Sequence, residues 1–207
     1  MSEILELYET QPELLLYGLL ACAATTLFLS LFIWFWIKTA TRRRIKVAIR
    51  EMGGQAVENI SLSDGVESAV HIDFCIYSKG YVFVFNIQDY PGIIFGGESI
   101  ELWTQLFEGK SYKFANPIYY NQLCTQVVRE LLPGIPVIGR VVFTHHGEFP
   151  KGKPEGVCEL NQLVGEAFSG LSNLTQNEKH SNTWQEFVQD LSQNKQTRIY
   201  KMQPLAN

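Results

Sequence analysis

Asp73, Asn86 and Gln88 are the residues whose types and spacing first suggest chemistry. They lie in the stretch 71–88, HIDFCIYSKGYVFVFNIQ, which predicts two antiparallel strands joined by a turn at 78–80. Asp73 is the only acid in this stretch. Because side chains two residues apart point to the same side of a strand, Asn86 and Gln88 share a face. Their oxygen atoms suit a hard cation such as Mg²⁺, but a neutral amide binds it far more weakly than a carboxylate.

Several short motifs surround this hairpin and keep a regular spacing between Ile45 and Leu163. They are Gly80-Tyr-Val-Phe-Val-Phe-Asn-Ile-Gln-Asp-Tyr-Pro-Gly92, Ile94-Phe-Gly96, Trp103-Thr-Gln105, Tyr112-Lys-Phe-Ala-Asn-Pro117 and Asn121. In this order the motifs resemble the NERD (nuclease-related) domain family, which has G-v-fviEtKny-G, I-x-G, W-T-Q and y-x-f-x-NP-x-x-Q-N. The stretch from W-T-Q to N-P is the most specific part of the resemblance.

The resemblance implies both a fold and a chemistry. NERD domains look like divergent PD-(D/E)xK nucleases, so we expect an α/β (α+β), restriction-endonuclease-like mixed sheet flanked by helices. In that superfamily, acidic side chains hold a divalent metal that activates water to cleave nucleic acid. Asp73 matches the family's aspartate, whereas Asn86 stands at the glutamate position and Gln88 at the lysine position. The resemblance therefore implies a degenerate catalytic site.

Two further acids could replace the missing carboxylate and keep an Mg²⁺-dependent nuclease active. Glu58 lies in the first predicted element, where members of the superfamily sometimes carry an extra acid. Asp89 follows Gln88, and its parity places it on the opposite face unless a bulge rotates it inward. If a metal binds at all, we expect Asp73 to hold it. Otherwise we expect no cofactor, with Asn86 and Gln88 hydrogen-bonded in a former active-site cleft.

Four polar or aromatic residues match the strongest family positions. Trp103, Gln105, Asn116 and Asn121 are expected to link the sheet to a helix, and Gln105 and Asn121 could also border the cleft. Asn116 before Pro117 is a typical helix start, with Asn as N-cap and Pro at the first helical position.

The segment 14–37 predicts a transmembrane helix. It has no charged residue, and at about 1.5 Å per residue it spans about 36 Å, against about 30 Å of hydrocarbon. A buried core helix is the alternative. Acidic residues precede the segment and basic residues follow it: Glu3, Glu6, Glu9 and Glu13, then Lys38, Arg42, Arg43, Arg44, Lys46 and Arg50. The positive-inside rule then places the N-terminus outside and the rest in the cytoplasm. Since the family is prokaryotic, we expect a single pass through the inner membrane.

The charge of the remaining chain bears on its partners. The chain has 17 Lys+Arg and 21 Asp+Glu; without the six basic residues at 38–50 and the four N-terminal Glu, 11 basic and 17 acidic residues remain. Because DNA affinity comes largely from phosphate neutralisation, an acidic domain with scattered basic residues predicts weak DNA binding. The leading hypothesis is a membrane-anchored, degenerate nuclease relative that binds nucleic acid or protein. A membrane-tethered interaction module without a nucleic-acid role, whose protein partner the sequence does not identify, is a further alternative. Membrane lipid is the other expected partner.

These observations divide the chain into five segments. They are an extracytoplasmic N-terminus at 1–13, the transmembrane helix at 14–37, a basic juxtamembrane helix at 38–52, the NERD-like domain at 53–168, and a linker with a C-terminal helix at 169–207. Besides the hairpin, local patterns predict strands at 93–95, 100–107, 112–114 and 137–144, a strand or short helix at 56–62, and helices at 116–132, 158–168 and 183–193.

Overall fold

The computed structural model describes the backbone of residues 12–63, 69–171, 178–192 and 198–202. The chain forms two compact units, Met1–Arg44 and Ile45–Asn207.

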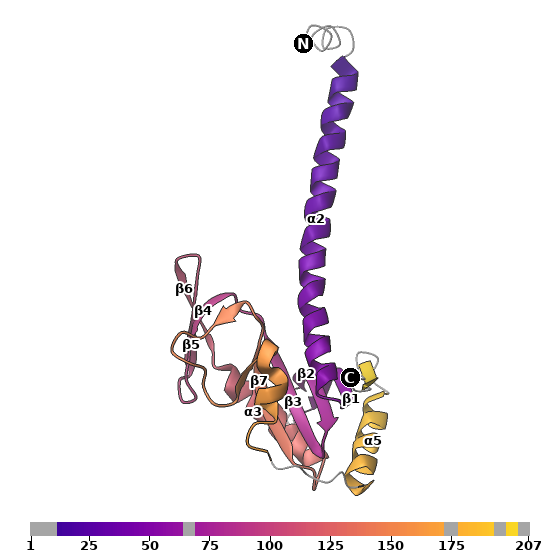
Figure 1. Cartoon of the computed structure of the whole chain (residues 1–207), viewed down its shortest axis with the longest axis vertical. Helices are drawn as coiled ribbons and strands as arrows, with labels where there is room; N and C mark the ends of the chain where they lie inside the picture. Colours follow the sequence, from indigo (N-terminus) through magenta and orange to yellow (C-terminus); the bar gives the residue numbers. More distant parts are fainter. Residues whose placement is uncertain (1–11, 64–68, 172–177, 193–197, 203–207) are drawn as a thin grey trace. The chain divides into compact units, whose positions relative to one another are not determined.

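The first unit consists of most of helix α2 (Pro12–Glu51), drawn in indigo in Figure 1. By length and composition, α2 can cross a membrane, and its side chains from Leu16 to Trp36 are exposed. The helix ends one residue before the predicted boundary at Met52. Gly53 and Gly54 follow with φ of 69° and 92°, a conformation that glycine adopts without steric cost.

The second unit is built on a six-stranded mixed sheet, sheet A. Its strand order is β10-β1-β2-β3-β7-β9. The strands are β1 (Gly54–Ser63), β2 (Ala69–Ser78), β3 (Tyr81–Gln88), β7 (Val137–Phe143), β9 (Val157–Glu159) and β10 (Arg198–Met202). β10, β1, β2 and β3 are antiparallel neighbours, whereas β7 and β9 continue parallel to β3. The predicted hairpin is therefore β2–β3, at the centre of the sheet.

A smaller sheet, sheet B, has the strand order β6-β5-β4-β8. Its strands are β4 (Gly92–Phe95), β5 (Leu102–Phe107), β6 (Lys110–Ala115) and β8 (Gly147–Glu148). β3 and β7 pair in parallel in sheet A, and the next strands along the chain, β4 and β8, pair in parallel in sheet B. The chain thus passes from sheet A to sheet B twice, from β3 to β4 and from β7 to β8, and the two connections run side by side.

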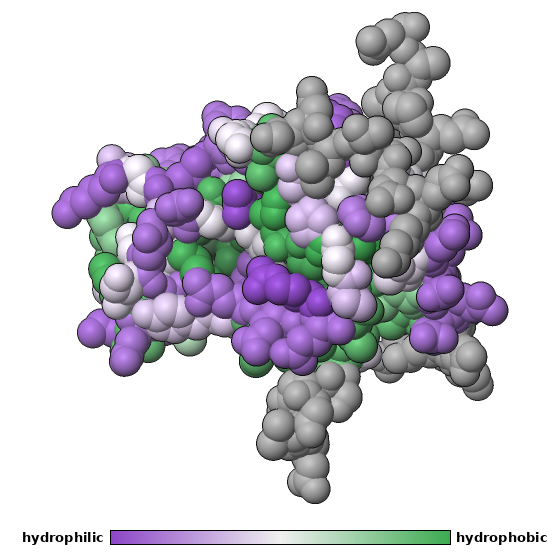
Figure 2. Space-filling view, turned by 90° about the horizontal axis from the view of Figure 1, so that it is seen from below, coloured by the Kyte–Doolittle hydropathy of each residue, from purple (hydrophilic) through white to green (hydrophobic). Residues whose placement is uncertain are grey.

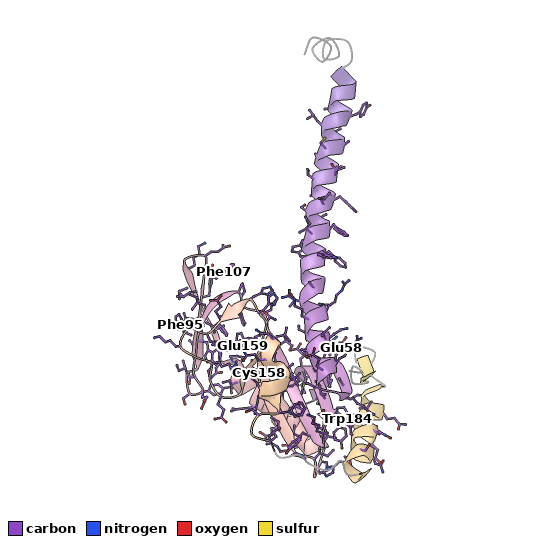
Figure 3. All side chains as sticks on the ribbon, viewed as in Figure 1. Glu58, Phe95, Phe107, Cys158, Glu159 and Trp184 are labelled. Carbon is purple, nitrogen blue, oxygen red and sulfur yellow. The ribbon has the colours of Figure 1, made fainter. Side chains whose placement is uncertain are left out.

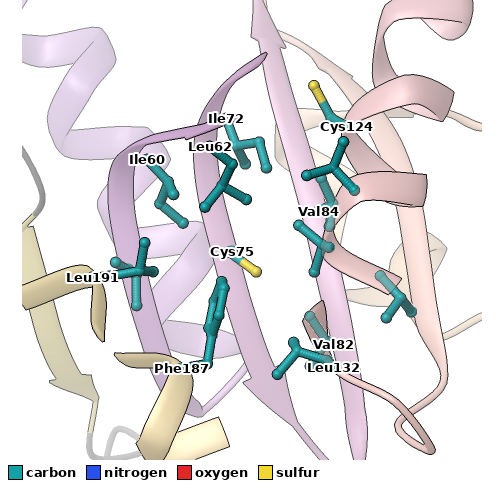
Figure 4. Packing of buried hydrophobic residues seen from close by; sticks show 14 of the residues in the cluster. Ile60, Leu62, Ile72, Cys75, Val82, Val84, Cys124, Leu132, Phe187 and Leu191 are labelled. Atoms are coloured by element: carbon teal, nitrogen blue, oxygen red, sulfur yellow. The ribbon is translucent and has the colours of Figure 1, made fainter. Parts of the chain in front are cut away.

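Helices cover both faces of sheet A. Helices α3 (Pro117–Leu131) and α5 (Glu178–Ser192) pack against Cys75, Val84 and their neighbours, as Figure 4 shows. The end of α2 and the short helix α4 (Leu163–Ala167) cover the other face, around Phe83. A third cluster joins the sheets around Trp103 and Phe143. All three clusters lie within Ile45–Asn207, so this unit contains its own core.

The mixed α/β (α+β) architecture predicted from the sequence is confirmed. One local prediction is corrected, and two short strands were missed. The expected helix at 158–168 begins as the edge strand β9, continues as a 3-10 turn (Leu160–Gln162) and is helical only in α4. The short strands β8 and β10 were not predicted. Since β8 has two residues and β10 follows no alternating pattern, tertiary pairing rather than local sequence forms them.

Candidate functional site

The site begins where the β2–β3 ladder ends. The last residues paired in register are Phe74 and Phe85. Beyond them, the Asp73 carboxylate takes over as an acceptor, because its Oδ2 receives a hydrogen bond from the Ile87 amide at 2.7 Å. Asp73 thus continues the connection between the strands with a side chain in place of a backbone carbonyl.

Asn86 makes the second link, and both ends of its amide are bonded. Its Nδ2 donates to the His71 carbonyl at 3.0 Å, and its Oδ1 accepts from Asn121 Nδ2 of α3 at 2.9 Å. The Asn121 Nδ2 also lies 3.1 Å from the Val84 carbonyl. Asn86 is only 3% exposed, so solvent does not compete for these bonds. The amide therefore ties β3 to β2 and to α3.

The His71 carbonyl is a common acceptor at this point. Besides Asn86, it accepts from Tyr120 Oη at 3.2 Å and from Cys124 Sγ at 3.6 Å, both on α3. Tyr120 Oη in turn accepts from the His71 amide at 2.7 Å. These hydrogen bonds thereby fix the backbone of β2 to α3.

The electrostatics of Asp73 reflect its partial enclosure. Burial raises the pKa of its carboxyl above the ordinary value, and the hydrogen bond from Ile87 and the nearby His71 offset only part of this effect. Oδ1 lies 3.9 Å from His71 Nε2. Gln88 is partly buried, and its side chain makes no hydrogen bond to any described residue.

This donor set does not fit the Mg²⁺ that the resemblance to nucleases implies. Mg²⁺ requires several oxygen ligands in near-octahedral geometry. Here Asp73 Oδ2 is already bonded to an amide, and Asn86 Oδ1 is bonded to Asn121 and buried. Across the described part of the chain, no group of three or more His, Cys, Asp or Glu side chains is placed to hold a metal ion.

Glu58 and Asp89 lie in other surroundings. Glu58 is 5% exposed, and its Oε2 lies 3.4 Å from Lys46 Nζ of α2; Figure 3 shows it beside the last turns of that helix. Asp89 follows β3, and its Oδ1 accepts from Thr144 Oγ1 at 2.5 Å and pairs with His146 Nδ1 at 2.7 Å. Both carboxylates thus have partners of their own away from Asp73.

The cluster of Asp89, Thr144 and His146 is the first feature that sequence reasoning missed. It lies where β3 and β7 leave sheet A for sheet B, and the Gly92 amide bonds to the His146 carbonyl at 2.8 Å. Burial alone raises the pKa of Asp89, but hydrogen bonds from Thr144 and His146 and the charges of both histidines outweigh it and lower the pKa. The parallel pairing of β3 and β7 brings these residues together, which no local motif signals.

Trp103 and Gln105 hold sheet B to the rest of the unit. Trp103 is fully buried against Phe143, with ring centroids 6.0 Å apart, and its Nε1 donates to Gly97 O. A Cβ on Gly96 would lie 2.1 Å from the Trp103 ring, which explains the glycine there. Gln105 is 9% exposed, and its Nε2 donates to the Pro91 carbonyl at 2.7 Å.

Asn116 is the N-cap of α3, as its position before a proline predicts. Its Oδ1 accepts from the Ile118 amide at 2.9 Å. Its Nδ2 lies within hydrogen-bond distance of three carbonyls of the loop at 97–100, those of Gly97, Glu98 and Ile100. One side chain thus starts the helix and shapes the loop between β4 and β5.

A polar groove beside α3 is the second feature that the sequence did not reveal. It has a volume of about 490 Å³ between α3 and β7, here named the α3–β7 groove. Arg129, Arg140, Asn121, Glu98 and Glu155 are among the residues that line it. Because the arginines belong to a helix and a strand, only the packing of α3 on β7 brings them to one groove.

Comparison with known proteins gives one match. The family model described as "Nuclease-related domain" (NERD) matches residues 38–144, more than half of the chain. No curated protein and no solved structure matches.

Proposed function

We propose, starting from the fact that the chain belongs to the nuclease-related domain (NERD) family, that it is a membrane-anchored domain that binds nucleic acid without cleaving it. The former catalytic positions hold the strands and α3 together. Binding takes place in the α3–β7 groove, and α2 keeps the domain at the inner membrane, with the N-terminus outside and the second unit in the cytoplasm.

The observation that carries this proposal is the double hydrogen bonding of Asn86. A metal ligand needs a free oxygen directed at the ion, but Asn86 Oδ1 accepts from Asn121 and is shielded from solvent. Asp73 likewise uses Oδ2 to bond the Ile87 amide. With Asn86 enclosed, Asp73 is left as the one carboxylate among these three positions, and we expect Mg²⁺ to bind there too weakly for phosphodiester cleavage.

The two arginines of the α3–β7 groove support a role in nucleic-acid binding. Arg129 Nη2 donates to Val137 O at 3.3 Å, and Arg140 Nη1 donates to Gly139 O at 3.0 Å. A guanidinium has five N–H donors, so each arginine keeps donors for a phosphate. Neither lies within ion-pair distance of a carboxylate among the described residues.

The two acids that line the groove limit the strength of this binding. Glu98 Oε1 accepts from the Glu155 amide at 3.0 Å, so this bond holds the Glu98 carboxylate at the groove. With two arginines and two glutamates the groove is close to neutral. We therefore expect weak binding that two phosphate contacts dominate, and that falls about tenfold between 50 and 200 mM salt.

The test uses the fragment 45–207, which contains the whole core, and fluorescently labelled single- and double-stranded DNA and RNA. We expect salt-dependent binding by anisotropy, and no Mg²⁺- or Mn²⁺-dependent cleavage above that of Asp73→Ala. Arg129→Ala with Arg140→Ala should abolish binding. Lys110→Ala with Lys113→Ala on sheet B removes the same charge elsewhere and should leave it unchanged.

Each contrary outcome would indicate a different property of the protein. Cleavage that Asp73→Ala abolishes would establish an active nuclease with a rebuilt metal site. Equal loss of binding in both double variants would mean that net charge alone attracts nucleic acid. Absence of binding at 50 mM salt would favour a protein-interaction module.

A further inference from the structure

One face of sheet B carries exposed apolar side chains. Cross-strand partners share a face, so Ile93 and Leu106 lie together, and Leu102 lies beside Ala115. The other face is the buried one, with Ile94, Trp103 and Gln105. Ile93, Leu102 and Leu106 are 37%, 53% and 38% exposed, and Ile100 in the adjoining loop is 52% exposed. Figure 2 shows hydrophobic side chains (green) that reach the surface of the molecule among hydrophilic ones (purple).

This face also has a hollow and two lysines. A cavity of about 280 Å³ lies among Phe95, Ile100, Leu102 and Thr104, with Lys151 at its wall. The Lys151 ammonium lies 5.5 Å from the centre of the Phe95 ring. Lys113 is paired with Thr104 and so lies on the same face. Apolar side chains between lysines match the boundary between the acyl chains and anionic headgroups of a bilayer.

The segment between the predicted span and the second unit is short, which keeps the second unit near the membrane. The predicted span ends at Ile37, and the second unit begins at Ile45, within the same continuous helix. At about 1.5 Å per residue, these eight steps correspond to about 12 Å. A domain held this close meets lipid headgroups at a high effective concentration, so a modest apolar surface is enough to bind.

We propose that the outer face of sheet B docks on the anionic leaflet of the membrane, with Leu102 and Leu106 in the headgroup region and Lys113 and Lys151 on lipid phosphates. This inference rests on the membrane anchoring of the proposed function, but not on its nucleic-acid binding. Glu148 is the neighbour of Ile93 in the sheet and is exposed at the β8 edge. Because a carboxylate is repelled by anionic headgroups, the β5–β6 side of the face is the one that enters the headgroup region.

The test places the full chain in nanodiscs of phosphatidylcholine, with and without phosphatidylglycerol, and measures amide hydrogen exchange of β4 to β6. We expect exchange of the exposed β6 edge to be about tenfold slower in anionic nanodiscs than in detergent. Leu102→Ser with Leu106→Ser should remove this protection. Tyr119→Ser with Leu123→Ser replaces an equally exposed pair on α3 and serves as the matched control. Lys113→Glu with Lys151→Glu should remove the dependence on phosphatidylglycerol.

The outcomes separate this inference from the anchoring on which it rests. Failure of the chain to enter nanodiscs would refute the anchoring. Incorporation with equal exchange in nanodiscs and detergent would overturn the docking alone. Protection that depends on protein concentration rather than on lipid would show that a second copy covers the face, which also overturns it.

Discussion

Replacing Asn86 by aspartate tests whether this position has a structural role or is a latent metal site. The change keeps the shape of the side chain but removes the Nδ2 that donates to the His71 carbonyl at 3.0 Å. It also places a negative charge at a position that is 3% exposed and faces that carbonyl. The bond from Asn121 Nδ2 can still reach the new carboxylate.

The expected loss of stability follows from these two effects, the lost hydrogen bond and the enclosed charge. A lost hydrogen bond of this kind costs about 1 kcal/mol, and the His71 carbonyl keeps the Tyr120 hydroxyl as a donor, so it is not left unpaired. An enclosed ionised carboxylate costs far more than a neutral group, so the new side chain should take up a proton, and burying the neutral group with one donor adds about 1–3 kcal/mol. We expect Asn86→Asp to lower the free energy of unfolding by about 2–4 kcal/mol, a large share of the about 5–15 kcal/mol of an ordinary domain.

The assay is urea unfolding of the fragment 45–207, followed by the fluorescence of Trp103 and Trp184, which are both fully buried. The midpoint should fall with an unchanged slope. Gln88→Glu adds the same charge two residues along at a partly buried position, and should change stability by less than about 0.5 kcal/mol. Unchanged stability of Asn86→Asp would refute this reasoning. Recovery of its stability in millimolar Mg²⁺ would also refute it, and would identify the position as a metal ligand.

Two carboxylates give further predictions with opposite pH dependence. The folded pKa of Asp73 is raised above its ordinary 3.8, so its contribution to stability is present at acid pH and is lost as pH rises through the folded pKa. Asp73→Asn retains an acceptor for Ile87 and should be at least as stable as the parent at pH 7, whereas Asp73→Ala leaves that amide unpaired and should lose about 1–3 kcal/mol in urea unfolding. The folded pKa of Asp89 is lowered, so its contribution is present above pH 3.8 and is lost as pH falls through the folded pKa. Asp89→Asn should therefore destabilise the fragment by less than about 1 kcal/mol at pH 7, since the side chain is half exposed, and the difference should vanish at acid pH; the same loss at both pH values would contradict the assignment.

Local signals were sufficient for the part of the fold that carries the family motifs. The turn at 78–80, the alternation before it and the aromatic and β-branched run after it predicted the central hairpin, and Asn116 before Pro117 predicted the start of α3 to the residue. These features depend on backbone preferences within a few residues, which a single sequence displays directly.

Pairings between distant segments were beyond the reach of the sequence. Strand β10 forms because β1 offers it an edge, and helix α5 lies on sheet A through Trp184, whose Nε1 bonds to Gln55. The meeting of Asp89 with His146 depends in the same way on the parallel pairing of β3 and β7. In each case the partner is chosen by tertiary packing, which no pattern within a single segment identifies.

A neutral side chain at position 86 fits the enclosed surroundings of this part of β3. A glutamate at position 86 would need solvent or a metal, because an unpaired buried carboxylate is costly. An asparagine can be enclosed once both ends of its amide are bonded, as they are here by His71 and Asn121. The neutral amide therefore allows α3 to bond directly to β3.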